Sequence, residues 1–88
     1  MAFLPPPQTP LNQHSLEALE TWLHQLGGHR EHNDPACWTL LTPKWSALIY
    51  LGQEDMQVTW DKDGKRKQRS FIYLLSRYDV EAAIKAGP

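Results

Sequence analysis

The chain has 88 residues and a formal net charge of −1, with nine basic and ten acidic residues. A chain of this length forms one small domain with a single core, which excludes a large catalytic cleft with its own substrate domain. Because the net charge is close to zero, no overall field attracts DNA or a membrane surface, and any basic function must be local.

The single cysteine, Cys37, excludes a disulfide framework within the chain and favours a reducing compartment. No apolar run reaches the roughly 18 residues that span a bilayer. The first ten residues, "MAFLPPPQTP", lack the basic and apolar regions of a secretory signal. We therefore expect a soluble cytoplasmic protein that does not insert into membranes.

Residues 1–14 contain four of the seven prolines. Proline fixes φ and lacks a backbone donor, so this segment is predicted to be an extended arm near the polyproline II conformation. It could be a ligand for a proline-binding groove, or a stiff arm that lies across the domain with Phe3 and Leu4 as anchors. Residues 15–88 are predicted to form a single α+β domain.

Two helices are predicted, one on each side of a β-rich region. The first covers residues 15–26, because Ser15 is a favourable N-cap and the leucines at 16, 19, 23 and 26 form one apolar stripe. The second starts with the capping box of Ser76 and Asp79 and ends at Gly87.

Four runs between the helices are rich in β-branched and aromatic residues: "CWTLLT", "WSALIYL", "MQVTW" and "KQRSFIYLL". Turn signals separate them, and Asp63-Gly64 is the strongest, typical of a type I′ hairpin turn. The pattern predicts a four-stranded antiparallel meander between the two helices, with residues 29–36 as a polar loop.

Even-length turns fix a register for this sheet. Asp63-Gly64 places Lys67 opposite Trp60 and Phe71 opposite Met56, and the other turns extend the same apolar row through the first two strands. One face then collects most of the large apolar residues, and we expect both helices to cover it.

The opposite face is mixed, and its apolar members mark a protein-binding surface: Leu41, Leu48, Tyr50, Ile72 and Leu74. The alternatives are that the proline-rich arm covers this face or that a second copy does, as a homodimer.

Five of the nine basic residues lie in one short stretch: Lys62, Lys65, Arg66, Lys67 and Arg69. This basic patch could dock an acidic protein surface or contact the phosphates of a nucleic acid, with Trp60 as a stacking platform. Its other interpretation is structural, because charges on a hairpin and an edge strand keep sheets from aggregating.

Candidate chemistry is sparse. His24, His29, His32 and Cys37 carry metal-binding groups, but their spacing is not that of a familiar zinc module. Cys37 opens a strand beside Trp38, where a small apolar role is more typical than an activated nucleophile. We predict no catalytic residue, no metal and no cofactor.

Two blocks of the sequence, "LPPPQTPL" with "WLHQLGG" and "RSFIYLLSRYDVEAAIKAGP", resemble a small cyanobacterial family called domain of unknown function 3143. The second block carries the specific part of the resemblance, while His14-Ser15 departs from the His-Pro that is usual before the first helix. The resemblance implies a small α+β domain in a photosynthetic cell and implies no reaction.

These features together predict a non-enzymatic adaptor or assembly protein. It would dock on a larger protein assembly, photosynthetic or translational, through the open sheet face and the basic hairpin 62–69. The alternative is an RNA-binding or ribosome-binding protein that uses the same hairpin.

Overall fold

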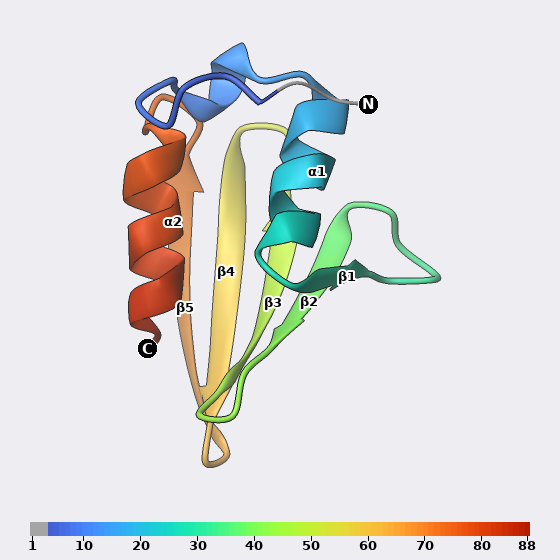
Figure 1. The fold of residues 1–88 in the computed structure, drawn as a ribbon. Helices are drawn as coiled ribbons and strands as arrows, with labels where there is room; N and C mark the ends of the chain where they lie inside the picture. The colour runs from blue at the N-terminus through green and yellow to red at the C-terminus, as the bar shows by residue number, and fades with distance from the viewer. Residues whose placement is uncertain (1–3) are drawn as a thin grey trace.

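A computed structural model describes residues 4–88 of the chain. The elements in chain order are a short 3-10 helix η1 (Leu11–Gln13), helix α1 (Leu16–Gln25), strands β1 (Gly28–Arg30), β2 (Cys37–Leu41), β3 (Ser46–Leu51), β4 (Asp55–Lys62) and β5 (Lys65–Ile72), and helix α2 (Arg77–Ala86). The strands form one antiparallel sheet in the order β1-β2-β3-β4-β5 (Figure 1).

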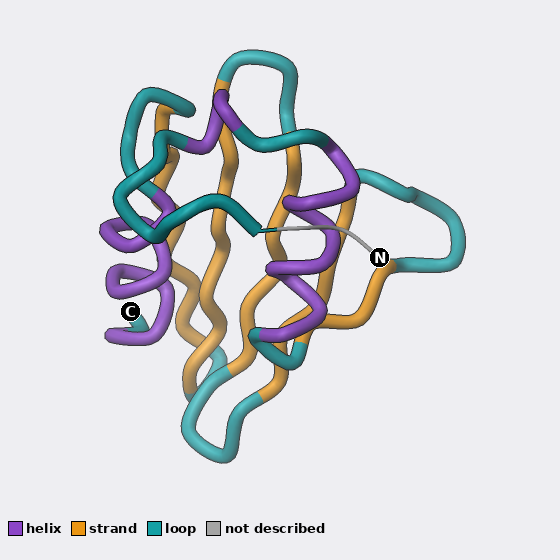
Figure 2. The backbone as a smooth tube through the Cα atoms, turned by 45° about the horizontal axis from the view of Figure 1, so that its top comes forward, coloured by secondary structure: helices purple, strands orange, loops and turns teal. Residues whose placement is uncertain are grey.

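The two helices lie side by side over the same face of the sheet, and within residues 4–88 no helix lies on the opposite face (Figure 2). This two-layer arrangement confirms the predicted α+β class with both helices on one face. The core lies between the layers and includes Trp22 from α1, Met56 and Val58 from β4, and Ile84 from α2.

The predicted register is confirmed in the three hairpins from β2 to β5. Trp38 pairs with Ile49, Ile49 with Val58, and Met56 with Phe71. The turn between β4 and β5 has positive φ at both central residues, 55° at Asp63 and 79° at Gly64, as a type I′ turn requires. The turn therefore sets which side chains of β5 face the helices.

Strand β1 was not predicted, because residues 29–36 were expected to form a loop. It is only three residues long, and its sequence Gly-His-Arg has no apolar alternation that would indicate a strand. Side-chain contacts with neighbouring elements hold β1 in place. Arg30 Nη1 lies 2.7 Å from Glu20 Oε2 on α1, and the Arg30 guanidinium lies over the ring of Trp38 on β2. The sheet therefore has five strands rather than four.

Helix α1 begins as expected, with the Ser15 hydroxyl accepting a hydrogen bond from the Ala18 amide. Its buried side follows most of the predicted leucine stripe, because Leu23 is buried and Leu19 and Leu26 pack against the core. Ala18, Trp22 and Leu23 are buried, whereas Leu16 is 64% exposed in the first helical turn. Trp22 widens the stripe and is fully buried in the core.

Helix α2 is specified at both ends as predicted. The Ser76 hydroxyl accepts from the Asp79 amide, and Gly87 follows the helix with a φ of 80°. Val80 and Ile84 are buried against the sheet, one turn apart. The caps thus fix the position of α2 along the outer strands.

The N-terminal segment, residues 4–14, forms a strap over one end of both helices (Figure 1). Two backbone hydrogen bonds tie it to the turn after β5, from Leu11 N–H to the Leu75 carbonyl and from Asn12 N–H to the Tyr73 carbonyl. Residues 11–13 are a 3-10 helix rather than extended chain, and Leu11 is buried. Leu4 packs against the core, and Phe3 lies outside the described residues.

A polar contact joins the two helices beneath the strap. The indole N–H of Trp22 donates to Glu81 Oε1 at 2.8 Å, and Glu81 Oε2 lies 3.3 Å from Lys85 Nζ. Burial alone would raise the pKa of Glu81, but the hydrogen bond from Trp22 and the neighbouring Lys85 hold it below its ordinary value. The carboxylate therefore satisfies a buried donor that would otherwise lack a partner.

Replacing Gly64 with alanine tests the turn. A Cβ at this position meets nothing within 4 Å, so the cost comes from the positive φ alone. We expect Gly64→Ala to lower the free energy of unfolding by about 1 kcal/mol in urea denaturation. Lys62→Ala, at an exposed neighbour with an ordinary φ, is the matched control; equal stability of the two variants would contradict the assigned turn.

Replacing Glu81 tests the contact between the helices. Glu81→Ala leaves the Trp22 indole N–H buried without an acceptor, so we expect a loss of about 1 to 3 kcal/mol in the free energy of unfolding near neutral pH. Glu81→Gln keeps an acceptor oxygen and should lose less.

The stability difference between wild type and Glu81→Gln has a defined pH dependence. Because the pKa of Glu81 is lowered in the folded state, its stabilising contribution is present above the ordinary glutamate pKa and is lost as pH falls through the lowered value. The stability difference between wild type and Glu81→Gln should therefore shrink as the pH falls from neutral to below the ordinary glutamate pKa. A difference that grows on acidification would contradict the assigned sign.

Candidate functional site

The open face of the sheet carries an apolar patch on β2 and β3. Leu41, Leu48 and Tyr50 are 67%, 44% and 41% exposed. Thr39 pairs with Leu48, so Leu41 lies diagonally beside Leu48, and Tyr50 follows two residues along the same strand face. We call these three residues the open-face patch.

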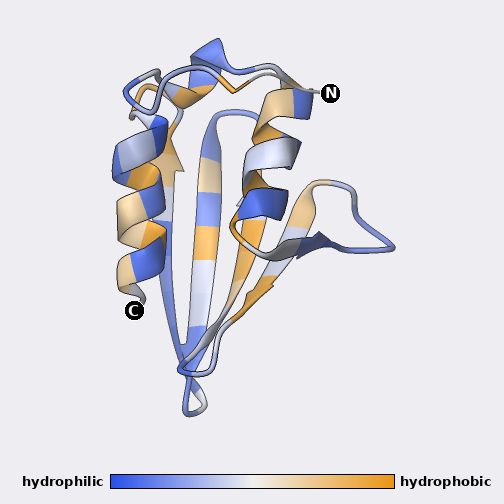
Figure 3. Cartoon of the chain, in the orientation of Figure 1, coloured by the Kyte–Doolittle hydropathy of each residue, from blue (hydrophilic) through white to orange (hydrophobic). Residues whose placement is uncertain are grey.

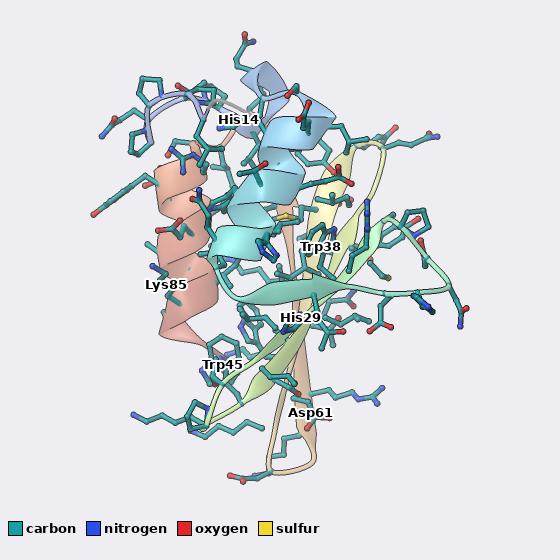
Figure 4. All side chains as sticks on the ribbon, turned by 45° about the vertical axis from the view of Figure 1, so that its right-hand side comes forward. His14, His29, Trp38, Trp45, Asp61 and Lys85 are labelled. Carbon is teal, nitrogen blue, oxygen red and sulfur yellow. The ribbon has the colours of Figure 1, made fainter. Side chains whose placement is uncertain are left out.

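A groove of about 240 Å³ runs beside the patch and is lined by Thr39, Leu41, Ser46, Ala47, Leu48, Thr59, Asp61 and Arg66. One side is therefore aliphatic, and the end near the β4–β5 turn carries the Asp61–Arg66 ion pair at 3.6 Å. Figure 4 shows Asp61 toward this end of the sheet. The groove combines an apolar wall with a charged end, which suits a peptide or a protein surface more than a small polar substrate.

Two residues predicted for the same surface lie apart from it. Ile72 is 54% exposed and pairs with Asp55, while Leu74 is 70% exposed in the turn after β5. Strand β4 lies between Tyr50 on β3 and Ile72 on β5, and Tyr50 is in line with Gln57 and Ser70 rather than with Ile72. Leu74 was assigned to the sheet face because β5 was expected to continue to residue 75, whereas the strand ends at Ile72.

The basic patch divides between the two faces of the sheet. Side chains alternate along β5, so Arg66 lies on the open face beside Asp61, while Lys65, Lys67 and Arg69 lie on the helix side. Lys62 lies on the helix side as well, opposite Lys65. Figure 3 shows that β5 is hydrophilic along most of its length.

The four helix-side cations have no acidic partner within 4.0 Å among residues 4–88. The outer three border a hollow of about 400 Å³, which is lined by Lys62, Asp63, Lys65, Arg66, Lys67 and Pro88. The Arg69 guanidinium instead lies over the Phe71 ring, 4.9 Å from its centroid. Positive side chains therefore gather between the hairpin and the end of α2, with Asp63 the acidic residue among them.

Trp60 is not the stacking platform that the sequence suggested. It is 2% exposed, and its indole N–H donates to the Ile84 carbonyl on α2 at 3.4 Å. Its pairing with Lys67 is correct, but the ring is used in the core. A base could not stack on it without unpacking α2.

Sequence reasoning missed a close contact between the β2–β3 turn and the end of α2. Trp45, in the β2–β3 turn, lies so close to Gly87 that a Cβ there would be 2.6 Å from the indole nitrogen. Figure 4 shows Trp45 beside the C-terminal end of α2. The tryptophan was placed on the helix side by alternation, but no local signal links it to a glycine more than forty residues away.

Cys37 lies at the start of β2 and is half-buried. Burial raises the pKa of its thiol, and the neighbouring carboxylates of Asp34 and Glu31 raise it further. The thiol is therefore held in its protonated form, which is the less nucleophilic one.

Among residues 4–88, no three histidine, cysteine or acidic side chains come together as a metal site.

No helix within the described part of the chain is long and apolar enough to cross a membrane.

Comparison with known proteins gives a match to the family DUF3143, described as "protein of unknown function", over residues 26–87. The chain belongs to this family. The match includes the whole sheet and α2, and it starts after α1, so the strap and α1 lie outside it. No curated protein and no solved structure matched the chain.

The raised pKa of Cys37 predicts slow alkylation. At a pH near 8, we expect iodoacetamide to modify Cys37 more slowly than the same cysteine in the urea-unfolded chain, because less of the folded thiol is ionised. The pH at half-maximal rate should be higher in the folded protein. Asp34→Asn should lower it, with Asp63→Asn as the control; a folded midpoint below the unfolded one would contradict the assignment.

Proposed function

We propose that the protein is a non-enzymatic binding module that docks on another protein through the open face of its sheet and the β4–β5 hairpin. The observation that carries the proposal is the open-face patch, in which three large side chains are exposed on a sheet face without a helix. An antiparallel sheet commonly has one solvated face, but that face is then mostly polar. An exposed apolar cluster with a polar rim is typical of an interaction surface.

The rim of the surface supports the same proposal. The Asp61–Arg66 pair lies at one end of the groove, and polar residues of β4 and β5 extend the face toward the free edge of the sheet. Charged residues at the rim contribute orientation and association rate, while a buried apolar centre contributes most of the affinity. The open face has both parts.

The cellular setting is part of the proposal. We propose a role in the cytoplasm of a cyanobacterial or related photosynthetic cell, on a photosynthetic or translational assembly, which is the setting that the sequence resemblance implies. A homodimer through the same face is the competing arrangement, and sedimentation at micromolar concentration distinguishes the two.

RNA binding at the hairpin is the second candidate. The four helix-side cations support it, because they lack acidic partners and could contact phosphates. The burial of Trp60 counts against it, since single-stranded RNA is usually held by stacking as well as by charge. We therefore place protein binding first.

Replacing Leu48 with lysine tests the open face. A charge in the middle of the patch should exclude an apolar partner, and we expect retention of the physiological partner to fall by about tenfold or more. The measurement is quantitative mass spectrometry of proteins retained from a lysate of the source organism. Thermal unfolding should be nearly unchanged, because Leu48 is already solvent-exposed.

Leu16→Lys is the matched control for this experiment. Leu16 is 64% exposed, but it lies on α1 in the opposite layer, so the same change in charge should leave the partner bound. If Leu48→Lys and Leu16→Lys retain the same proteins as wild type, the open face is not the docking surface.

A further inference from the structure

We infer that the outer edge of β5 binds an acidic, extended peptide segment by strand addition, as a sixth strand of the sheet. The inference deepens the proposed function by naming how the hairpin half of the docking surface would recognise a partner. It requires a free backbone edge, a geometry that permits pairing, and a charge pattern that selects the partner.

The edge is free along most of its length. Strand β5 is the last strand of the sheet and pairs only with β4. Six consecutive residues, 65–70, are exposed. The opposite edge strand, β1, is only three residues long. The described part of the chain therefore has one edge long enough to hold a peptide.

The turn determines which backbone groups point outward. Residues that flank a two-residue hairpin turn exchange both backbone hydrogen bonds, and such pairs alternate along an antiparallel ladder. The amides of Lys67 and Arg69 consequently point toward β4, whereas those of Arg66, Gln68 and Ser70 point away from the sheet. Outside the ladder, no backbone hydrogen bond within residues 4–88 involves these three.

The strand also lacks the structural features that usually protect an edge. Its eight pairs with β4 run without a bulge from Lys62–Lys65 to Asp55–Ile72, and it contains no proline. Natural edges are commonly blocked by bulges, prolines or charges. Of these three protective features, β5 has only the charges. Positive charges repel a basic partner and attract an acidic one, so they do not exclude every partner.

The charges select an acidic occupant. Lys65, Lys67 and Arg69 project to the helix side, two residues apart, so that an added strand would place every second side chain next to a cation. Outer acidic side chains of that strand would border the 400 Å³ hollow, which Lys62 and Lys65 also line. Four cations without acidic partners favour carboxylates at these alternating positions.

The same pattern disfavours a second copy of this chain. Two β5 strands paired edge to edge would bring Lys65, Arg66, Lys67 and Arg69 of one copy against the same residues of the other. Like charges on directly opposed strands are destabilising. The edge charges thus reject self-association and favour an acidic segment.

A synthetic peptide tests the inference directly. The probe is a short capped peptide that alternates glutamate and valine, titrated into the full chain at low salt and followed by calorimetry and by amide hydrogen exchange. Binding should slow exchange at Arg66, Gln68 and Ser70 by about tenfold or more, because their amides gain acceptors. The amides of Lys67 and Arg69 should change little.

Modified peptides separate strand addition from simple charge attraction. A peptide with the same charge but N-methylated amides on its pairing side cannot donate to β5 and should bind at least about tenfold more weakly. A glutamine–valine peptide lacks the charge and should also bind weakly. Equal binding of the N-methylated peptide would overturn the inference.

Variants of the protein test the contributions of charge and of backbone pairing separately. Lys65→Glu with Lys67→Glu should weaken peptide binding by about tenfold or more, whereas Lys44→Glu, in the β2–β3 turn, should not. Gln68→Pro removes one outward amide and no ladder bond, so it should abolish the pairing, while Gln68→Ala should retain it. If Gln68→Pro does not fold, the N-methylated peptide still decides the question.

Other occupants give distinct results, and each would overturn the inference. Single-stranded polyuridine that binds more tightly than the acidic peptide, with affinity falling steeply as salt rises, would assign the hairpin to nucleic acid. Protection of Arg66, Gln68 and Ser70 without peptide, together with dimers in sedimentation, would assign it to a second copy. Leu48→Lys should leave peptide affinity unchanged, so failure here and failure of the open-face proposal are distinguishable.

Discussion

The alternation of side chains across one two-residue turn controls most of this structure. With positive φ at Asp63 and Gly64, β5 can pair with β4 in only one register, which puts Phe71 beside Met56 in the core. A shift by one residue would expose Phe71 and direct charged side chains toward α2. The apolar core, the divided basic patch and the outward amides of β5 all follow from this turn.

Much of this could be read from the sequence, because its determinants are local. Turn residues and apolar alternation predicted the pairs from β2 to β5, and the Ser76 cap and Gly87 predicted the two ends of α2. Strand β1 escaped prediction because three residues without an apolar pattern carry no strand signal. It is held by Glu20 and Trp38, which only the folded chain brings near Arg30.

The candidate site was predicted less completely, for the same reason. Leu41, Leu48 and Tyr50 were found because they share a face, but Leu74 was included by extending β5 beyond its end. The basic run looked like one patch in the sequence, whereas alternation distributes it over both faces. The proximity of Trp45 to Gly87 depends on the packing of α2, which no short-range pattern encodes.

The strap also has a consequence for how the chain folds. Nearly all strand pairs join neighbours in the sequence, so the meander can form through short loop closures. The strap instead joins residues 5–12 to residues 73–78, through bonds such as Arg77 Nη2 to the Pro5 carbonyl. These contacts close the longest loop in the molecule. Folding should therefore proceed from the central hairpins outward, and the two ends of the chain should meet last.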